Sequence, residues 1–147
     1  GVSSAASDVY KRQLWHVMEH LEHLNETWEM LRELLTEKGM LIVAVPNCSS
    51  YDAGRYGEYW AAYDVPRHLW HFTPVTIQQL ASRHGFIMAA RHPMPFDAFY
   101  VSMLSEKHRG SSCSFLKGMY AGTLAWFSTL GRKERSSSMI YVFRKKR

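Results

Sequence analysis

The chain has 147 residues, of which 46% are hydrophobic and 21% are charged. This composition is typical of one globular domain and excludes a largely disordered chain. Two cysteines, Cys48 and Cys113, stand in no motif, which excludes a disulfide framework or a thiolate zinc site and favours a cytoplasmic protein.

The net charge of +5 is concentrated near the C-terminus, where residues 131–147 hold seven cations against Glu134 alone. A basic tail can attract nucleic acid or anionic lipid, but a solvated chain end beside a final strand is the simpler interpretation. No basic patch is interleaved with aromatic residues, so we expect no nucleic-acid partner.

In chain order, the first feature is an abrupt change at Gln13/Leu14. Residues 3–13 have no helical or strand period, whereas residues 14–20 are apolar and typical of a domain interior. With one choice of codons, residues 3–13 resemble the translated adapter of a transposase-based sequencing library. We therefore interpret residues 1–13 as a non-native segment with no part in the fold, which would leave the natural N-terminus missing. A gene that uses other codons here, or continues upstream through these residues, would contradict this interpretation.

The next segment predicts a helix followed by a strand. Apolar residues at three- and four-residue spacing between Leu21 and Leu35 predict an amphipathic helix, with Asn25 as its N-cap and Lys38-Gly39 as its end. Residues 40–45 are apolar on both faces, which is typical of a strand covered on both sides in a parallel sheet.

Residues 49–72 are dense in aromatic side chains and have little periodicity, so we expect a long, lid-like loop. Its aromatic residues either exclude water from an apolar substrate or pack as a small hydrophobic core under the loop. They are Tyr51, Tyr56, Tyr59, Trp60, Tyr63, Trp70 and Phe72.

The following residues predict a helix and two more strands. Thr73-Pro74 predicts a helix start and Gly85 predicts its end. Residues 86–91 and 139–143 have the composition of strands. Helices and strands therefore alternate, which predicts an α/β fold with a largely parallel sheet.

The last third of the chain is expected to hold an insert of helices over residues 98–135, then a last strand and basic tail over residues 136–147. Within the insert, residues 115–130 are apolar and aromatic but too short to span a membrane, and they include Lys117. We expect an amphipathic helix there, either on the domain surface, which is the favoured interpretation, or at a membrane interface.

Residues 15–21, residues 31–47, and residues 64–73 with 84–86 form three blocks. These blocks resemble class I S-adenosylmethionine-dependent methyltransferases. Trp15-His-Val-Met-Glu-His-Leu21 resembles the end of the family's strand four and the turn after it, and residues 31–47 resemble helix D and strand five. The most specific block, Asp64-Val-Pro-Arg-His-Leu-Trp-His-Phe-Thr73, followed by His84-Gly-Phe86, resembles a subgroup of small-molecule methyltransferases. The resemblance implies the C-terminal half of a Rossmann-like α/β sheet, strands four to seven, with the N-terminal half missing.

The same resemblance implies S-adenosylmethionine as the cofactor, with Trp15, His16 and Val17 beside it. The family holds this cofactor with a glycine-rich turn after strand one and an acidic residue at the end of strand two. No Gly-x-Gly motif occurs in this sequence. We therefore expect the chain alone neither to bind the cofactor nor to fold stably.

The spacing His16-x-x-Glu19-His20 has two interpretations. Some family members carry Glu-x-x-Glu-His at this turn and bind a divalent ion with a later histidine, which here would be His68 or His71. The metal ligands would then be Glu19, His20 and that histidine, a set that suits zinc, iron or manganese. In the favoured alternative, Glu19 caps the turn or pairs with an imidazole.

The resemblance predicts methyl transfer to a small molecule of apolar or aromatic character. Trp60, Tyr63 and Arg67 are the predicted substrate contacts, and His68 or His71 is the predicted base for an acceptor that loses a proton. The competing hypothesis is a non-catalytic interaction domain that contacts a membrane through residues 115–130 and the basic tail. A hydrolase is disfavoured, since no glycine-bracketed serine is present.

Overall fold

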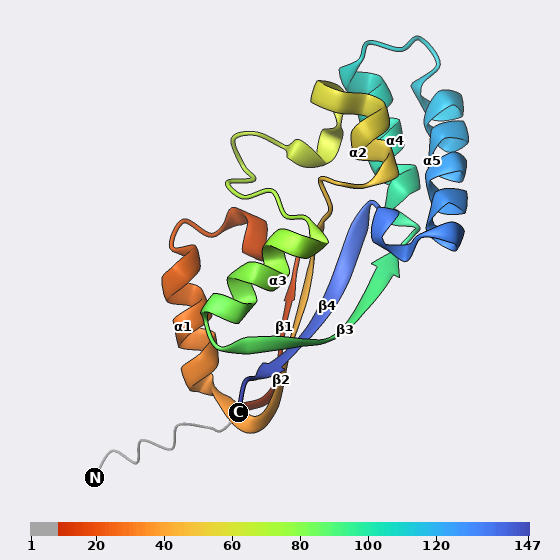
Figure 1. Cartoon of the computed structure of the whole chain (residues 1–147). Helices are drawn as coiled ribbons and strands as arrows, with labels where there is room; N and C mark the ends of the chain where they lie inside the picture. Colours follow the sequence, from red (N-terminus) through yellow and green to blue (C-terminus); the bar gives the residue numbers. More distant parts are fainter. Residues whose placement is uncertain (1–8) are drawn as a thin grey trace.

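The computed structural model describes residues 9–147, which form one four-stranded sheet with helices packed on it (Figure 1). The strand order is β1-β2-β4-β3, where β1 and β2 are parallel and β4 is antiparallel to both of its neighbours. Consequently β1, β2 and β3 run in one direction and their carboxyl ends lie at the same edge of the sheet. The strands are β1 (Val9–Trp15), β2 (Leu35–Pro46), β3 (Phe86–Met94) and β4 (Ser138–Lys145).

The predicted α/β class is confirmed, and the four strands take the places expected for strands four, five, six and seven of the Rossmann-like sheet. Strands were predicted at residues 86–91 and 139–143, and β3 and β4 contain them. Of the four strands, β4 alone runs against the rest, so the sheet is largely parallel, as expected.

The strand β1 differs from the expectation that residues 1–13 take no part in the fold. Residues 9–13 belong to β1, and Lys11 to Trp15 pair in order with Met40 to Ala44 of β2. Tyr10, the three residues after it and Trp15 are all exposed. Buried and exposed side chains therefore do not alternate along β1, and the sequence shows no strand period there. Residues 1–8 of the interpreted non-native segment lie outside the described residues.

One face of the sheet carries the main core, beneath α1 (Leu24–Leu34) and α3 (Pro74–Arg83). Trp28 of α1 is completely buried and makes edge contacts with Phe86 and Phe143. On the other face of β2, Ala44 is buried but Met40 and Ile42 are only half-buried, so the expected cover on both sides is less complete on this face.

The bounds of α1 correct two predicted caps. The residue before the helix is His23, not Asn25, whose side-chain oxygen instead lies 3.0 Å from Nε2 of His84. The helix ends at Leu34, and the extended Leu35 already pairs with β1. Gly39 therefore lies inside β2 and is not a helix cap, because pairing with β1 extends the strand backward beyond its apolar run.

The bounds of α3 agree with the prediction. The hydroxyl of Thr73 accepts a hydrogen bond from the backbone N–H of Thr76, and Pro74 is the first helical residue. After the helix, Gly85 has φ of 76°, a left-handed conformation that glycine adopts without strain.

Residues 49–72 are not the long loop that was expected. They contain α2 (Tyr51–Tyr56) and the 3₁₀ helices η2 (Gly57–Tyr59) and η3 (Ala61–Tyr63). Tyr56 and Trp60 are buried with Ala53 and Ala121 in a second small core, as one of the two interpretations of the aromatic residues required.

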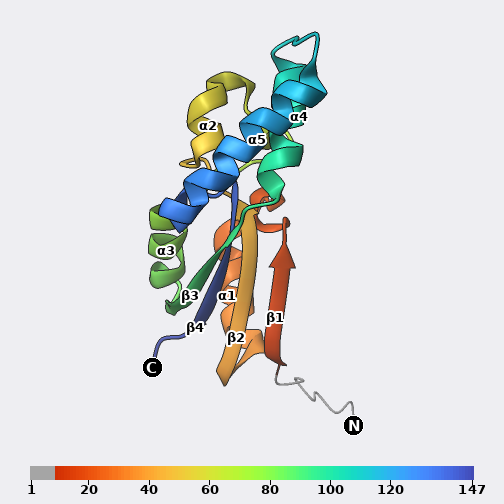
Figure 2. The ribbon, with the colours of Figure 1, turned by 90° about the vertical axis from the view of Figure 1, so that its right-hand side faces the viewer.

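The helical hairpin of α4 (Asp97–His108) and α5 (Ser114–Gly131) projects beyond the sheet and is followed by the 3₁₀ helix η4 (Lys133–Arg135) (Figures 1 and 2). The two helices pack closely because α5 presents glycines to α4. None of the helices among residues 9–147 is long and apolar enough to cross a membrane.

Candidate active site

A cavity of about 590 Å³ lies outside the carboxyl ends of the parallel strands, where open α/β sheets bind their ligands. Most of its wall comes from three segments, which are the turn after β1, residues 61–68, and α4, which follows β3. Pro46 at the end of β2 and Ser138 at the start of β4 complete it. One part of the wall is charged and another is apolar. The lining residues are His16, Glu19, Pro46, Ala61, Ala62, Asp64, Arg67, His68, Asp97, Tyr100, Val101, Leu104, His108 and Ser138.

Backbone hydrogen bonds join the turn after β1 to the segment that carries the most specific motif. The turn is the 3₁₀ helix η1 (Met18–His20), and the carbonyl oxygen of Glu19 accepts the N–H groups of Leu69 and Trp70 at 2.8 and 3.2 Å. The indole N–H of Trp70 also donates to the carbonyl of Leu21 at 2.7 Å. The first and third blocks of the family resemblance therefore form one structural unit.

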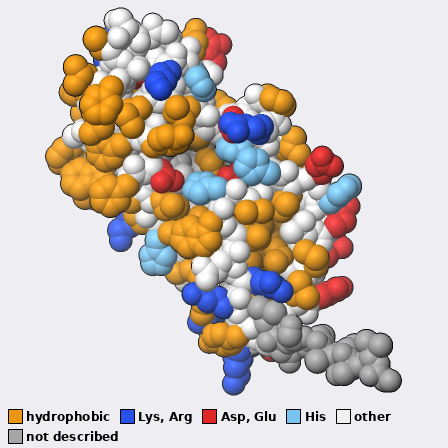
Figure 3. All heavy atoms as spheres, turned by 180° about the vertical axis from the view of Figure 1, so that it is seen from behind, with side chains coloured by type: hydrophobic (Ala, Val, Ile, Leu, Met, Phe, Trp, Pro, Cys, Tyr) orange, Lys and Arg blue, Asp and Glu red, His pale blue; other side chains and the backbone are white. Residues whose placement is uncertain are grey.

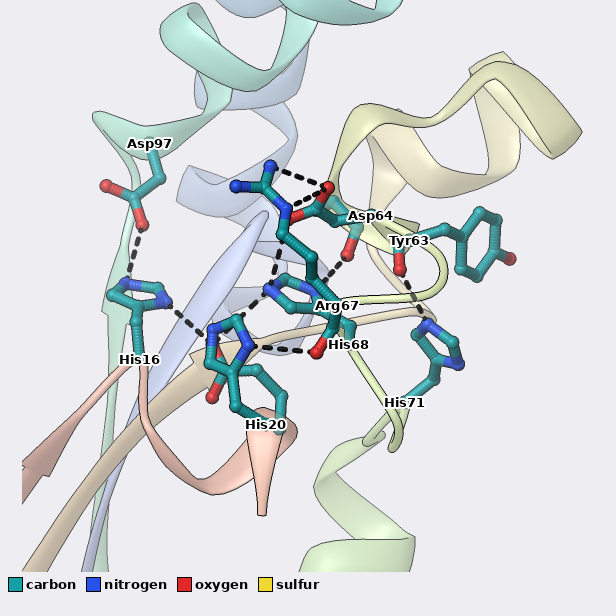
Figure 4. Close-up of polar contacts among 10 residues, drawn as sticks. His16, His20, Tyr63, Asp64, Arg67, His68, His71 and Asp97 are labelled. Carbon is teal, nitrogen blue, oxygen red and sulfur yellow. Dashed lines mark hydrogen bonds and ion pairs between the residues drawn. The ribbon is translucent and has the colours of Figure 1, made fainter. Parts of the chain in front are cut away.

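His16 connects the end of β1 to the start of α4 (Figure 4). Its Nδ1 lies 3.3 Å from Oε1 of Glu19, and its Nε2 lies 3.5 Å from Oδ2 of Asp97. The contact with Asp97, followed by that with Glu19, raises the pKa of His16 to about 9 despite its partial burial. His16 is therefore an imidazolium at neutral pH, and its φ of 50° is an uncommon conformation for a residue with a side chain.

Asp97 is the complementary group at the start of α4. Burial raises the pKa of its carboxyl, but the contacts with His16 and Ser138 outweigh burial and lower the pKa overall. Asp97 was not predicted from the sequence. It lies in the segment that follows the predicted strand of residues 86–91, and segments that follow parallel strands face the ligand site.

Glu19 is buried, with a side chain 1% exposed, and neither carboxylate oxygen has a hydrogen-bond partner among the described residues. Its Oε1 lies 3.9 Å from Nε2 of His68, which is itself 3.8 Å from Oδ2 of Asp64. Oε1 forms an ion pair with His16, so Oε2, which has no polar partner among the described residues, is the oxygen available to a ligand.

The structure brings Glu19, His20 and His68 together, with one ligand atom of each within 4.8 Å of the others. Nδ1 of His20 lies 2.9 Å from the carbonyl of Arg67, and Nδ1 of His68 lies 2.8 Å from the carbonyl of Ala62. Since a carbonyl only accepts, both Nδ1 atoms donate, and each Nε2 is the ring nitrogen left to bind a metal ion. Histidines that bind metal ions are commonly oriented in this way.

The other predicted histidine lies elsewhere. Nε2 of His71 is bonded to the carbonyl of Tyr63 at 2.9 Å, and the exposed His71 ring is not part of the cavity wall. Tyr63 packs edge-on between the rings of Trp60 and His71 and is also absent from the wall. The predictions of His71 as a cavity base and of Tyr63 as a substrate contact thus do not fit this cavity.

Trp60, a predicted substrate contact, lies in the second core and not in the wall of this cavity. Its side chain is 1% exposed in the second core, and its indole N–H donates to Asp52 at 2.9 Å. Arg67 does line the cavity and binds Oδ1 of Asp64 through Nε and a terminal nitrogen, at 3.2 and 2.8 Å. Of the three predicted cofactor contacts, only His16 lines the cavity. Trp15 and Val17, its neighbours in the chain, have exposed side chains.

Comparison with known proteins identifies the family. Residues 13–90 match the family described as a methyltransferase domain, and the chain belongs to this family. No curated protein matches the chain.

Solved structures share the fold at low sequence identity. The cyclase SpnF has a TM-score of 0.56 and 10% identity, over 95% of this chain and 50% of that one. The mycolic acid cyclopropane synthase CmaA1, complexed with SAH and CTAB, has a TM-score of 0.53 and 12% identity, over 94% of this chain and 56% of that one. A phosphoethanolamine N-methyltransferase 2 of Haemonchus contortus has a TM-score of 0.51 and 12% identity, over 94% of this chain and 33% of that one. The chain thus spans about half or less of the length of these structures.

Proposed function

We propose that the chain forms the acceptor side of an S-adenosylmethionine-dependent methyltransferase that acts on a small molecule. The observation that carries this proposal is the cavity at the carboxyl ends of β1, β2 and β3, in a chain of the methyltransferase-domain family. Among the similar folds, the Haemonchus contortus enzyme is in complex with S-adenosylhomocysteine and a phosphorylated amine. The likeness of fold supports the same cofactor here.

The cofactor would meet this chain at the end of β1. Trp15 and Val17 are 46% and 39% exposed on either side of His16, so their side chains are free to contact a ligand. When bound, S-adenosylmethionine supplies an electrophilic methyl group. Since no Gly-x-Gly turn is present in the sequence, we propose that these residues alone hold the cofactor weakly and are inactive by themselves.

The cavity wall favours an acceptor with a polar end and an apolar body. His16, Glu19 and His68 would face the polar end, whereas Val101 and Leu104 of α4 would contact the apolar body. Alignment of the acceptor with the methyl group is the main contribution of such a site to the rate. His68 is the better placed base, because its Nδ1 is fixed to Ala62 and its Nε2 is directed to the carboxylates.

The test begins with the gene. If it encodes a glycine-rich turn and an acidic residue upstream of Leu14, the polypeptide that includes them is expected to transfer a radiolabelled methyl group to small amphiphilic acceptors. For an acceptor that must lose a proton, His68→Ala is expected to lower kcat by about 100-fold. The matched control His71→Ala is expected to retain activity.

Two results would contradict the proposal. Tight binding of S-adenosylmethionine by the 147-residue chain in calorimetry would contradict the weak cofactor contact. Absence of both upstream elements from the gene would favour the alternative function, a non-catalytic interaction domain.

A second candidate property is a divalent metal ion at Glu19, His20 and His68. It is supported by the buried Oε2 of Glu19, which has no polar partner among the described residues, and by the Nδ1 bonds of both histidines. Two nitrogens and one carboxylate suit zinc, iron or manganese better than magnesium. These three residues would hold the ion at the cavity wall, where it would polarise an acceptor oxygen. The alternative is that Glu19 pairs with His16 and binds no ion.

A further inference from the structure

The outer face of α5 has an unusual distribution of side-chain sizes. The helix buries small residues against α4: a Cβ added to Gly118 would lie 2.5 Å from Cα of Met103, and one added to Gly122 would lie 2.8 Å from Cα of Phe99. Ala121 and Ala125 are buried on the same face. The hairpin is therefore held by close backbone packing, and the large side chains of α5 are not used for it.

Those large side chains point outward. Leu116, Tyr120, Phe127 and Leu130 recur at helical spacing and are 57–68% exposed. Phe115 of the same helix, and Phe96 and Tyr100 at the start of the hairpin, are at least 62% exposed as well. Figure 3 shows hydrophobic side chains gathered over this upper end of the molecule, on the side where α5 lies. Contiguous apolar surface of this kind marks an interaction site.

The charges beside this surface are mainly positive. Residues 97–135 hold six cations and three acids. All three acids are engaged: Asp97 contacts His16, Glu106 is buried and Glu134 pairs with Arg91. All six cations are exposed. Arg109 and Arg135 lie over tyrosine rings, and the other four are Lys107, Lys117, Arg132 and Lys133. An anionic partner therefore fits the surface. A second copy of this chain would bring its own positive charges against those of the first.

We propose that the outer face of the α4–α5 hairpin binds the surface of an anionic phospholipid bilayer, with α5 lying in the plane of the interface. Apolar side chains would enter the headgroup region while the lysines and arginines at the helix ends meet lipid phosphates. The basic C-terminal residues Arg144 to Arg147 do not belong to this surface, because the C-terminus lies at the opposite end of the sheet (Figure 1). The proposal does not depend on methyl transfer.

Vesicle flotation of the 147-residue chain tests the proposal, after its fold has been checked by circular dichroism. We expect the chain to float with vesicles of phosphatidylcholine containing 30% phosphatidylglycerol, and to bind pure phosphatidylcholine at least about tenfold more weakly. Added salt is expected to weaken binding to the anionic vesicles.

Paired variants separate the apolar and the charged contributions. Leu116→Gln with Phe127→Gln is expected to weaken binding at least about tenfold. The control Val75→Gln, at an equally exposed position of α3, is expected to have no effect. The double variant Lys117→Glu with Lys133→Glu is expected to weaken vesicle binding by about fivefold or more per lysine. The control Lys38→Glu on β2, far from the hairpin, is expected to retain vesicle binding.

Two outcomes would overturn the proposal. One is vesicle binding that the Leu116→Gln and Phe127→Gln changes leave intact. The other is a chain that ignores vesicles but forms a dimer in light scattering, with the dimer lost in that double variant, since a second copy would then be the occupant.

Discussion

His16 Nε2 lies 3.5 Å from Oδ2 of Asp97, which couples the residue after β1 to the first residue of α4. This contact places a cation and an anion at the mouth of the cavity, next to the buried Glu19. It also ties the projecting hairpin to the edge of the sheet. The protonation of His16 is therefore linked both to the charge of the cavity and to the stability of the fold.

The pKa of His16 gives the first prediction. Asp97→Asn removes the largest cause of its elevation, so the pKa is expected to fall from about 9 toward the ordinary value of 6.5. Titration of the histidine ring signals by NMR measures this change. A pKa that stays near 9 in the variant would show that Asp97 is not the cause.

The stability of the chain should depend on the same group. The fold raises the pKa of His16, so its stabilisation is complete below pH 6.5 and is lost as the pH rises through 9. The free energy of unfolding, measured with urea, is expected to decrease between pH 6.5 and 9. The variant His16→Gln is expected to lack this part of the decrease. The control His23→Gln, at a side chain 79% exposed, should leave the decrease unchanged.

Metal binding at Glu19 is the next prediction. Co²⁺ is expected to give visible absorption bands with the chain, and Zn²⁺ is expected to displace it. Glu19→Gln keeps the shape of the side chain and should weaken binding at least about tenfold, because a ligand is lost. His71→Ala, outside the cluster, should bind normally. If the Glu19→Gln variant binds Co²⁺ as tightly as the parent chain, Glu19 is not a metal ligand and its role is the contact with His16.

Local patterns in the sequence predicted the features that depend on neighbouring residues. Thr73-Pro74 and Gly85 marked a helix because capping and a left-handed turn are set within a few residues. The choice between His68 and His71 was not predictable in this way. It depends on which backbone carbonyl orients each ring. The carbonyl of Ala62 holds the ring of His68 at the cavity, whereas the carbonyl of Tyr63 holds the ring of His71 outside it.

The burial of Trp60 and the role of Asp97 also depend on distant parts of the chain. Trp60 is covered partly by Ala121 of α5, a contact that no spacing around residue 60 indicates. Asp97 acquires its role only because β1 and β3 end at the same edge of the sheet. The sequence could therefore indicate the fold and the turn at Glu19, but not which side chains face the cavity.

Packing around Trp28 leads to a prediction about the core. Its side chain is fully buried between Phe86 and Phe143, so Trp28→Ala is expected to lower the free energy of unfolding by about 3 to 5 kcal/mol. Trp15→Ala removes a tryptophan side chain that is 46% exposed, and it should lower the free energy of unfolding much less. Urea unfolding of both variants measures the difference. Similar losses would mean that the edge of β1 contributes as much as the core.

The close approach of α5 to α4 is tested by enlarging one glycine. Gly122→Ala places a Cβ within 2.8 Å of Cα of Phe99, so the helices must separate, and a loss of about 1 to 3 kcal/mol is expected. Gly54→Ala is the matched control, since a Cβ there meets nothing within 4 Å and the helix α2 gains a better helix former. That variant should be neutral or stabilised by up to about 1 kcal/mol. If Gly122→Ala unfolds at the same urea concentration as the parent chain, the hairpin has room to adjust, and the close backbone approach at Gly122 does not contribute measurably to its stability.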